Sequence, residues 1–503
     1  MHLTRISVFT AALLIPISAV SAQALAVTTS TLSPGEIESI DTFVNSEMVR
    51  QQIPGVAIGI YSRGHILLAK GYGLANVELS VPVRPETIFQ SGSTGKQFVS
   101  AAIMMLVEEG KLSLDNSITK FFPDSPPTWK PILIKNLLSH TSGLSEYQTP
   151  ERTGPKGDFY LRLDLTEEEL LKRIETLPIE WPAGEKWGYR NTNYVLLGFV
   201  IHKVSGKPYA EYLQDRIFKP LGMTSTRLIS EREIIPNRSS GYELEDGQVK
   251  NQEWVSPTFV STADGSLYFN VLDLAKWDEA LYTTQLLTQA SLDRIWTVYA
   301  LNDGEPNWSN YGFGWFIDQQ NGHELVSHPG AWQGFSCQIS RYPTDNLSVV
   351  VLTNLDAHHS RPELIARVIA GLVDPSLMPS KFDPISDSKP EVAKILRTSL
   401  NRLISGEDIR PKPSPELAAR IDPGEKWAVM SSVPLSMLQQ RLAKSWPGGS
   451  LTLVKRASLS GDAHREVSVY RLTKGKEALL IVIVPEPKGS LSAFGVMADR
   501  PYE

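Results

Sequence analysis

A helix that is apolar on most of its sides limits what this chain can fold into more than any other stretch. From Ser93 to about Glu109 apolar residues recur at helical spacing, and Gly110 is well placed as the C-cap. Other elements have to enclose such a helix on nearly every side. The chain has 503 residues, of which 42% are hydrophobic, so it is long enough for a large enclosing domain and a second domain.

Ser93 and Lys96 stand at the start of this helix. Residues three positions apart share one helix face, so their side chains can touch. A serine hydroxyl is a weak nucleophile until a base takes its proton, and a lysine can be that base when burial or nearby cations lower its pKa. Ser93 is therefore a candidate nucleophile and Lys96 its candidate base. Free N–H groups at the helix start also favour negative charge beside Ser93.

Residues 89–98 have three rival interpretations, and two of them fail on the residues present. A phosphate-binding P-loop requires glycine at one position and serine or threonine at another, where the chain has Gln90 and Gln97. The nucleophile elbow of α/β-hydrolases requires glycine where the chain has Ser91. A polar helix start with a surface lysine is common, and Ser-x-x-Lys alone favours it. The rest of the chain has to decide.

The N-terminus has the three parts of a secretory signal peptide. Residues 1–5 carry positive charge, residues 6–20 are apolar, and small residues follow at the cleavage region. We predict a signal peptide over residues 1–22 and an exported protein, periplasmic or secreted, with an uncleaved anchor as the alternative. No later segment is long and apolar enough to span a bilayer, so we expect no transmembrane span after cleavage.

Net charge and cysteine content exclude several classes of function and of stabilising link. The net charge of −6 gives no sign of nucleic-acid binding, so we expect no nucleic-acid partner. Cys337 is the only cysteine, which excludes an intramolecular disulfide and a cysteine-based metal site. We expect it to be a buried strand residue.

The pattern of elements divides the chain. We predict a large domain over residues 31–374, a Pro-, Ser- and Asp-rich linker over 375–390, and a small α+β domain over 391–503. Ser33 and Glu36 form the pattern of a capping box before a helix, and residues 312–317 alternate glycine with aromatic residues as a closely packed strand would. In the small domain we expect helices near 391–403 and 434–446, and strands near 451–456, 466–472, 478–484 and 491–497.

A second motif, Tyr189-Arg190-Asn191, contains groups that suit the same chemistry. A nearby lysine ammonium favours the phenolate of Tyr189, which can then act as a base. Asn191 offers an acceptor to Lys96 and a donor to a substrate carbonyl. On its own the motif is equally consistent with a turn holding a buried aromatic residue.

A third motif is His328-Pro329-Gly330. On a strand beside a cleft, His328 can bond a polar group of a substrate, and Gly330 permits close backbone approach. The N–H groups of Ala331 and Ser93 would then suit an oxyanion hole. Alone, His328 is equally consistent with an ordinary surface or core histidine.

Taken together, the motifs resemble the serine penicillin-recognising enzymes, the β-lactamase-like superfamily. Ser93-Thr94-Gly95-Lys96 is similar to its Ser-x-x-Lys, and Tyr189-Arg190-Asn191 to the Tyr-x-Asn of class C β-lactamases and D-Ala-D-Ala carboxypeptidases. His328-Pro329-Gly330 is similar to the His-x-Gly of D-aminopeptidase-like relatives. The resemblance extends over roughly residues 37–372, and its surroundings agree in residues 137–144, 193–198 and 220–223.

The resemblance implies both a fold and a mechanism. The fold class is α/β (α+β): an antiparallel sheet flanked by helices, an all-helical subdomain with the site between them, and a small C-terminal α+β domain. The mechanism is acyl transfer on Ser93, with Lys96 and Tyr189 sharing the base role and the N–H groups of Ser93 and Ala331 holding the oxyanion. Neither metal nor cofactor is expected. The substrate-binding residues are Asn191, His328 and Gly330.

Two departures from the family pattern bear on the substrate. His328 stands where class C β-lactamases have lysine, and Arg190 lies where small residues are usual. We therefore expect an exported serine hydrolase that takes a small-molecule or peptide acyl substrate, cleaving small esters or amide bonds of D-amino-acid-type peptides. A class C-like β-lactamase and an inactive cell-wall-peptide binding protein are the alternatives. The sequence leaves the oligomeric state open.

Overall fold

The computed structural model describes residues 31–378, 387–407, 442–443, 446, 448–459, 462–474, 477–485 and 491–498. The predicted signal peptide, the middle of the predicted linker and most of the helix predicted near 434–446 lie outside these residues. Among the helices within the described ranges, none has the length and apolar character needed to cross a membrane.

A seven-stranded antiparallel sheet organises the large domain, in the order β3-β2-β1-β12-β11-β10-β9. Early and late parts of the chain meet at its centre, because β1 pairs with β12. The three central strands β1, β11 and β12 are buried along almost their whole length, so both faces of the sheet must be covered. The strands are β1 (Gly55–Ser62), β2 (His65–Asn76), β3 (Val81–Pro82), β9 (Phe316–Gln320), β10 (His323–Trp332), β11 (Phe335–Tyr342) and β12 (Leu347–Thr353).

Alternate residues of β1 belong to two different cores. Val56, Ile58 and Ile60 pack with α1 (Pro34–Gln51) and α10 (Pro362–Val373). Ala57 and Tyr61 face the other core, which also includes α8 (Val271–Ala280). The predicted capping box opens α1: the Ser33 N–H donates to the Glu36 carboxylate at 2.7 Å, and the Glu36 N–H donates to Ser33 Oγ at 3.2 Å.

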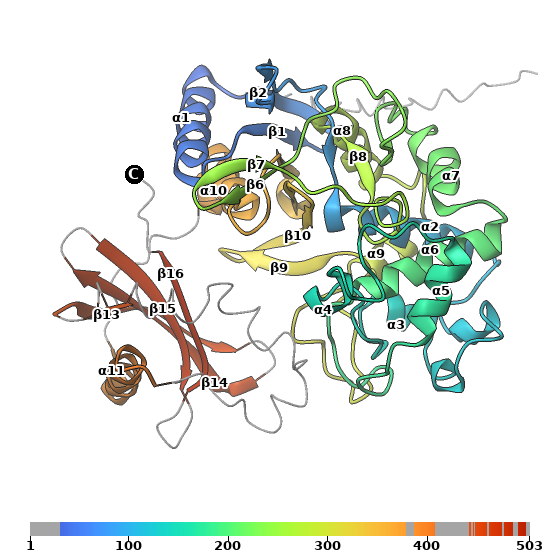
Figure 1. Ribbon diagram of the computed structural model, residues 1–503. Coiled ribbons are helices and arrows are strands. Elements are labelled where there is room, and N and C mark those ends of the chain that lie inside the picture. The colour runs from blue at the N-terminus through green and yellow to red at the C-terminus, as the bar shows by residue number, and fades with distance from the viewer. Residues whose placement is uncertain are drawn as a thin grey trace, which may run out of the picture. The chain divides into compact units, whose positions relative to one another are not determined.

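Helices beside the sheet form the other part of the large domain (Figure 1). The central one is α2 (Lys96–Glu108), in which every residue from Lys96 to Leu106 is buried, as its apolar sequence predicts. It packs in the same core as the surrounding helices. These are α3 (Ile134–Leu138), α5 (Glu167–Glu175), α6 (Asn191–Ser205), α7 (Tyr209–Leu213) and α9 (Gln289–Ile295).

Shorter elements complete the described part of the large domain. A small sheet with the order β4-β8-β5 leads into the segment that carries Ser93, and β6 and β7 form a separate hairpin. The bounds are β4 (Phe89–Gln90), β5 (Arg227–Leu228), β6 (Tyr242–Glu245), β7 (Gln248–Asn251), β8 (Leu267–Phe269) and α4 (Pro150–Thr153).

The C-terminal part has a four-stranded antiparallel sheet in the order β13-β14-β15-β16. The helix α11 (Pro390–Ile404) shares an apolar core with this sheet through Leu396, Leu400, Tyr470 and Ile481. The strands are β13 (Ser450–Leu459), β14 (Asp462–Lys474), β15 (Glu477–Pro485) and β16 (Leu491–Ala498). Each overlaps a predicted strand.

The expected mixed α/β fold with a large antiparallel sheet is confirmed, and two local expectations need correction. Ser93 lies in a 3₁₀ turn, Gly92–Gly95, and the α-helix begins only at Lys96. Residues 312–315 do not form a strand, because Gly314 has a φ of +78° and β9 starts at Phe316. Close packing at Gly312 is nevertheless present: a Cβ there would lie 2.4 Å from the carbonyl oxygen of Ile295.

Candidate active site

The turn that carries Ser93 is pressed between two stretches of backbone. Gly92 has a φ of +46°, and a Cβ on it would lie 2.4 Å from the backbone nitrogen of Ala331 on β10. A Cβ on Gly330 would lie 2.2 Å from the carbonyl oxygen of Ser91, and one on Gly265 would lie 2.7 Å from the carbonyl carbon of Gly92. Glycine at these positions lets β10 and the loop around Gly265 close on the turn, which fixes Ser93.

Lys96 is fully buried, and its ammonium group is completely hydrogen-bonded. Nζ donates to Ser93 Oγ at 2.9 Å, to Asn191 Oδ1 at 2.8 Å and to the backbone carbonyl of Asp264. These acceptors use all three protons of an ammonium group. Burial lowers the pKa of Lys96 to about 8, although the charges of Asp264 and Glu146 act in the opposite direction.

Tyr189 lies just before α6, next to both Ser93 and Lys96. The Nζ of Lys96 sits 5.0 Å from the centre of the phenol ring. Burial raises the pKa of Tyr189 well above its usual value, and a hydrogen bond with Ser93 acts in the opposite direction. The phenol is therefore protonated at neutral pH. Of the two candidate bases, Lys96 is the one whose pKa lies near neutrality.

Asn191 begins α6, and a short loop orients its side chain. Its Nδ2 donates to Gln148 Oε1 at 2.9 Å, which leaves Oδ1 facing Lys96. Its backbone N–H donates to Glu146 Oε2 at 2.6 Å, so a carboxylate caps the start of the helix. Gln148 and Tyr147 continue the network, because Gln148 Nε2 donates to the Tyr147 hydroxyl, which in turn donates to Asp264 Oδ2, each at 2.8 Å.

The sequence did not reveal this supporting loop. No recognisable motif contains Glu146, Tyr147, Gln148 or Asp264. The small residues at 261–266 also gave no sign that the Asp264 carbonyl would accept a hydrogen bond from Lys96. The only signal available was position: the first three directly follow the family-like segment 137–144.

His328 lies on β10 with both ring nitrogens occupied by the protein. Its Nε2 accepts from the Tyr311 hydroxyl at 3.0 Å, and its Nδ1 donates to the Pro329 carbonyl at 2.6 Å. Burial, with a smaller contribution from the charge of Lys96, lowers the pKa of His328 to about 3. The side chain is thus a neutral imidazole, and it does not line the hollow at Ser93. The predicted substrate contact of His328 stays a prediction.

The edge of β10 turns toward Ser93 beyond the end of β9. The two strands pair only as far as Ser327, opposite Phe316. Pro329 pairs with Gln338 of β11 without an N–H to donate, which is tolerated where the N–H would point away from the partner strand. Backbone N–H groups two residues apart on a strand point to the same side. The N–H of Ala331 therefore also points away from β11, to the side of β10 that β9 no longer pairs with.

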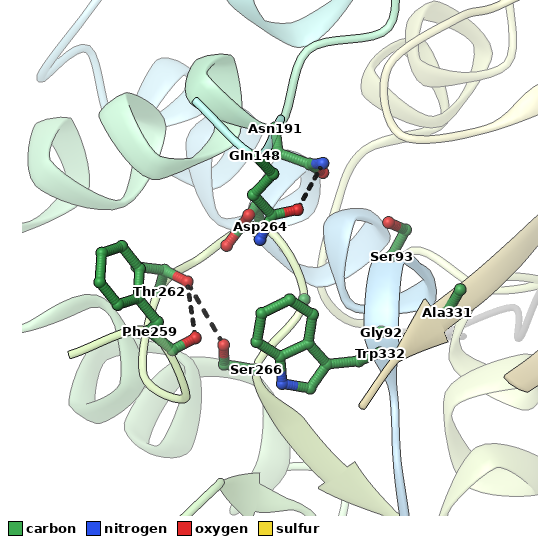
Figure 2. A pocket seen from close by; sticks show the side chains of 11 residues that line it. Gly92, Ser93, Gln148, Asn191, Phe259, Thr262, Asp264, Ser266, Ala331 and Trp332 are labelled. Carbon is green, nitrogen blue, oxygen red and sulfur yellow. Dashed lines mark hydrogen bonds between the residues drawn. The ribbon is translucent and has the colours of Figure 1, made fainter. Parts of the chain in front are cut away.

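A hollow of about 270 Å³, open to solvent, lies in front of Ser93. Figure 2 shows Ser93 and Ala331 on one side of it and Phe259 and Thr262 on the other. Aromatic surface from Phe259 and Trp332 lies opposite polar groups. The lining residues are Gly92, Ser93, Gln148, Asn191, Phe259, Thr262, Asp264, Gly265, Ser266, Ala331 and Trp332.

Arg190 points away from this hollow. Its guanidinium donates to Glu180 Oε2 at 2.7 Å and lies 5.2 Å from the ring centre of Trp181. The arginine inside the second motif therefore ties the chain before α6 to residues 180–181. Within the described ranges, no group of three His, Cys, Asp or Glu side chains is arranged to hold a metal ion.

The fold and the arrangement of the site define the class of β-lactamase- and transpeptidase-like proteins. The Beta-lactamase family matches residues 40–373, and the chain belongs to that family. This confirms the resemblance drawn from the three motifs.

Curated relatives match more than half of the chain. Penicillin-binding protein 4* of Bacillus subtilis (strain 168) is 30% identical over 314 residues, covering 58% of this chain and 66% of the relative. Protein flp of Staphylococcus aureus (strain MRSA252) is 29% identical over 343 residues, covering 67% of this chain and 66% of the relative. The chain thus spans about two thirds of the length of these relatives.

Solved structures show the same fold. The octameric penicillin-binding protein homologue from Pyrococcus abyssi has 24% identity and a TM-score of 0.61, covering 92% of this chain and 96% of its own. D-amino acid amidase from Ochrobactrum anthropi SV3, solved with L-phenylalanine amide, has 24% identity and a TM-score of 0.57, covering 68% and 97%.

Proposed function

We propose that the protein is an exported serine hydrolase that forms an acyl-enzyme on Ser93 and cleaves small esters or amide bonds of D-amino-acid-type peptides. The observation that carries the proposal is the contact of Lys96 Nζ with Ser93 Oγ at 2.9 Å, together with burial that lowers the pKa of Lys96 to about 8. A lysine in this condition supplies free amine at neutral to mildly alkaline pH.

The acylation step follows from these contacts. The neutral amine of Lys96 takes the proton of Ser93 as Oγ attacks the substrate carbonyl carbon. The carbonyl oxygen becomes an oxyanion held by the N–H groups of Ser93 and Ala331, an arrangement that contributes about 3–4 kcal/mol per donor in comparable sites. The tetrahedral intermediate then collapses: the bond from the carbonyl carbon to the leaving group breaks, and the ester forms on Ser93.

Tyr189 completes the proton transfers. Because its phenol is protonated and bonded to Ser93, it can donate a proton to the departing alkoxide or amine and recover one from Lys96. In deacylation the same groups activate a water, which attacks the acyl carbon and returns Ser93 to its starting state. Lys96, Tyr189 and Ser93 titrate as a coupled set.

The hollow supports small acyl groups as substrates. Phe259 and Trp332 provide apolar wall, and Asn191 is placed to donate to a substrate carbonyl when Nδ2 leaves Gln148. Amide cleavage next to a D-amino acid is suggested by the names of two structural neighbours, a D-stereospecific amidohydrolase from Streptomyces sp. and the amidase from Ochrobactrum anthropi.

The β-lactamase alternative is less well supported. A lysine in the third motif would bring a positive charge toward the carboxylate of a β-lactam, whereas His328 is neutral and both its nitrogens are engaged. The binding-protein alternative does not explain why Ser93, Lys96, Tyr189 and Asn191 are all present in contact, because simple binding does not require a deprotonable lysine.

A hydrolysis panel on the purified mature protein tests the proposal. It compares p-nitrophenyl butyrate, D-alanine p-nitroanilide and a chromogenic cephalosporin, with Ser93→Ala as the catalytic variant and Ser39→Ala on the exposed face of α1 as the matched control. We expect ester or D-anilide turnover that Ser93→Ala abolishes and Ser39→Ala preserves. Turnover that survives in Ser93→Ala would overturn the mechanism, and dominant cephalosporin turnover would favour the β-lactamase.

Export is tested separately. We expect fractionation of cells expressing the full chain to place a processed form in the periplasm or medium. Recovery of the unprocessed chain with the cytoplasm would contradict export without affecting the hydrolase proposal.

A further inference from the structure

The segment 137–144, which resembles the family but has no role in the mechanism above, contains an unusually placed histidine. His140 has no exposed surface and a φ of +58°, a left-handed conformation that is uncommon for residues other than glycine, although histidine adopts it more often than most. It does not line the hollow. A buried polar side chain in a strained backbone position calls for an explanation in terms of what it touches.

His140 contacts the chain around Tyr189 on three consecutive residues. Its carbonyl oxygen accepts from the N–H of Gly188 at 3.0 Å. Its Nδ1 accepts from the N–H of Arg190 at 3.2 Å and also from Nδ2 of Asn193 at 3.1 Å. Between these bonds the ring of Tyr189 packs on the imidazole, with centroids 4.2 Å apart and planes at 35°. One residue therefore accepts from the backbone N–H groups of both neighbours of Tyr189 and also packs on its ring.

These contacts fix the state of the imidazole. A backbone N–H can only donate, so Nδ1 is the acceptor and the proton resides on Nε2. Nε2 has no hydrogen-bond partner within the described residues, and such an unmet donor has a desolvation cost. Burial and the nearby charge of Lys96 lower the pKa of His140 well below its usual value, which keeps the ring neutral.

Other aromatic rings close the arrangement. Tyr311 and Tyr194 lie 4.9 and 5.1 Å from the imidazole, measured between ring centroids. Tyr311 also donates to His328 on β10, and the rings of both histidines contact those of Tyr189 and Tyr311. An imidazole meets both needs here, since phenylalanine has no acceptor for the Arg190 N–H and asparagine has no ring for Tyr189.

We propose that His140 is a positioning residue for Tyr189, which uses its carbonyl, Nδ1 and ring face to hold the phenol over Ser93 and Lys96. The inference rests on the proposed function of Tyr189. It assigns His140 no contact with substrate and no proton transfer.

The first test is His140→Asn in the full mature protein. Asparagine tolerates positive φ and retains an acceptor for the Arg190 N–H, so the fold is expected to persist while the stacked ring is lost. We expect kcat to fall about tenfold or more while KM stays within about threefold, the pattern of a lost transition-state contact. The matched control is His202→Asn on the exposed side of α6, which we expect to behave as wild type. Unchanged kcat in folded His140→Asn would overturn the proposal.

A double variant separates positioning from general destabilisation. If His140 acts through Tyr189, adding His140→Asn to Tyr189→Phe should reduce kcat by no more than about twofold further. A further drop as large as that in the wild-type background would show that His140 acts independently of the phenol, and would overturn the proposal.

A third measurement does not depend on turnover. In protein labelled with 3-fluorotyrosine, the ¹⁹F resonance of Tyr189 is assigned by its absence in Tyr189→Phe. We expect this resonance to shift or broaden in His140→Asn and to stay in place in His202→Asn. An unmoved resonance would overturn the positioning role even in a protein without measurable hydrolysis. Absence of Ser93-dependent turnover in the wild type, in contrast, would count against the proposed function alone.

Discussion

In the proposed mechanism, Lys96 acts as a base only in the form that has lost its proton. Its pKa in the folded protein is lowered to about 8, so the fraction of free amine grows as the pH rises through this value. We therefore expect kcat/KM for an activated ester to increase from pH 6 to a plateau above about pH 9. A pH–rate profile of the wild type measures this, and a flat or falling profile over the same range would exclude Lys96 as the base.

Lys96→Arg separates charge from basicity at the same position. Arginine keeps a positive charge but does not lose its proton in proteins. If Lys96 is the base, this variant should lose a factor of about 10²–10⁴ in kcat. If the lysine provided only positive charge, Lys96→Arg would retain much more activity than Lys96→Ala. Lys135→Arg, at a partly exposed ion pair with Asp115, is the control.

The sequence predicted which candidate catalytic residues come together better than it predicted the residues that contact them. Ser93, Lys96, Tyr189 and Asn191 occur in recognisable motifs, and the structure brings them into contact. Gln148 could not be predicted, because its contact with Asn191 depends on a loop whose path no local pattern encodes. The engaged ring nitrogens of His328 could not be predicted either, because Nε2 bonds Tyr311, which lies in a separate loop.

At the scale of elements, β10 and the turn before α2 depend on each other. A methyl group on Gly330 would lie 2.2 Å from the Ser91 carbonyl oxygen, so Gly330→Ala must push β10 away from the turn. We expect this variant to lose about 1–3 kcal/mol of stability and most of its Ser93-dependent turnover. Calorimetry and the ester assay measure the two effects.

Gly35→Ala provides the control for this substitution. The position lies in the first turn of α1, and no atom would come within 4 Å of the new methyl group. We expect equal or slightly greater stability and unchanged turnover, because alanine is the better helix former. If Gly330→Ala behaved like Gly35→Ala, the close approach of β10 would not matter for the site.

Long, regular elements were predictable and short ones were not. The α1 cap and the apolar α2 follow from local chemistry that the sequence states directly. The hairpin of β6 and β7 has mostly exposed residues, so no apolar alternation marks it. The positive φ of Gly314 keeps residues 312–315 out of β9, which starts only at Phe316, and the alternation of glycine with aromatic residues could not show that.

For the whole molecule, the described apolar cores fall into separate stretches of chain. Three of them use residues from Leu32 to Leu377, whereas the core of the C-terminal part uses residues from Val392 to Ile483. We predict that a chain limited to residues 32–378 unfolds in one cooperative transition and keeps turnover within about threefold of the mature protein. Calorimetry and the ester assay on this shortened chain are the measurements. Loss of cooperative unfolding would show that the C-terminal part is required for the fold.

The fold of residues 40–373 was predictable because three motifs with the right order and separation occur in one known family. Its sheet joins β1 to β12 across most of the domain, a pairing that local patterns do not reveal. The resemblance to the family implied the large antiparallel sheet, which local sequence patterns do not indicate.

Cys337 lies on β11 and contacts the backbone just before the turn that carries Ser93. Its Sγ is 2.9 Å from the Ser91 carbonyl oxygen, and burial raises the pKa of the thiol to about 12. As the chain's only cysteine, it can be attacked by a thiol reagent only when β11 separates from the turn. The rate at which a thiol reagent labels Cys337 therefore measures how often β11 separates from the turn that carries Ser93.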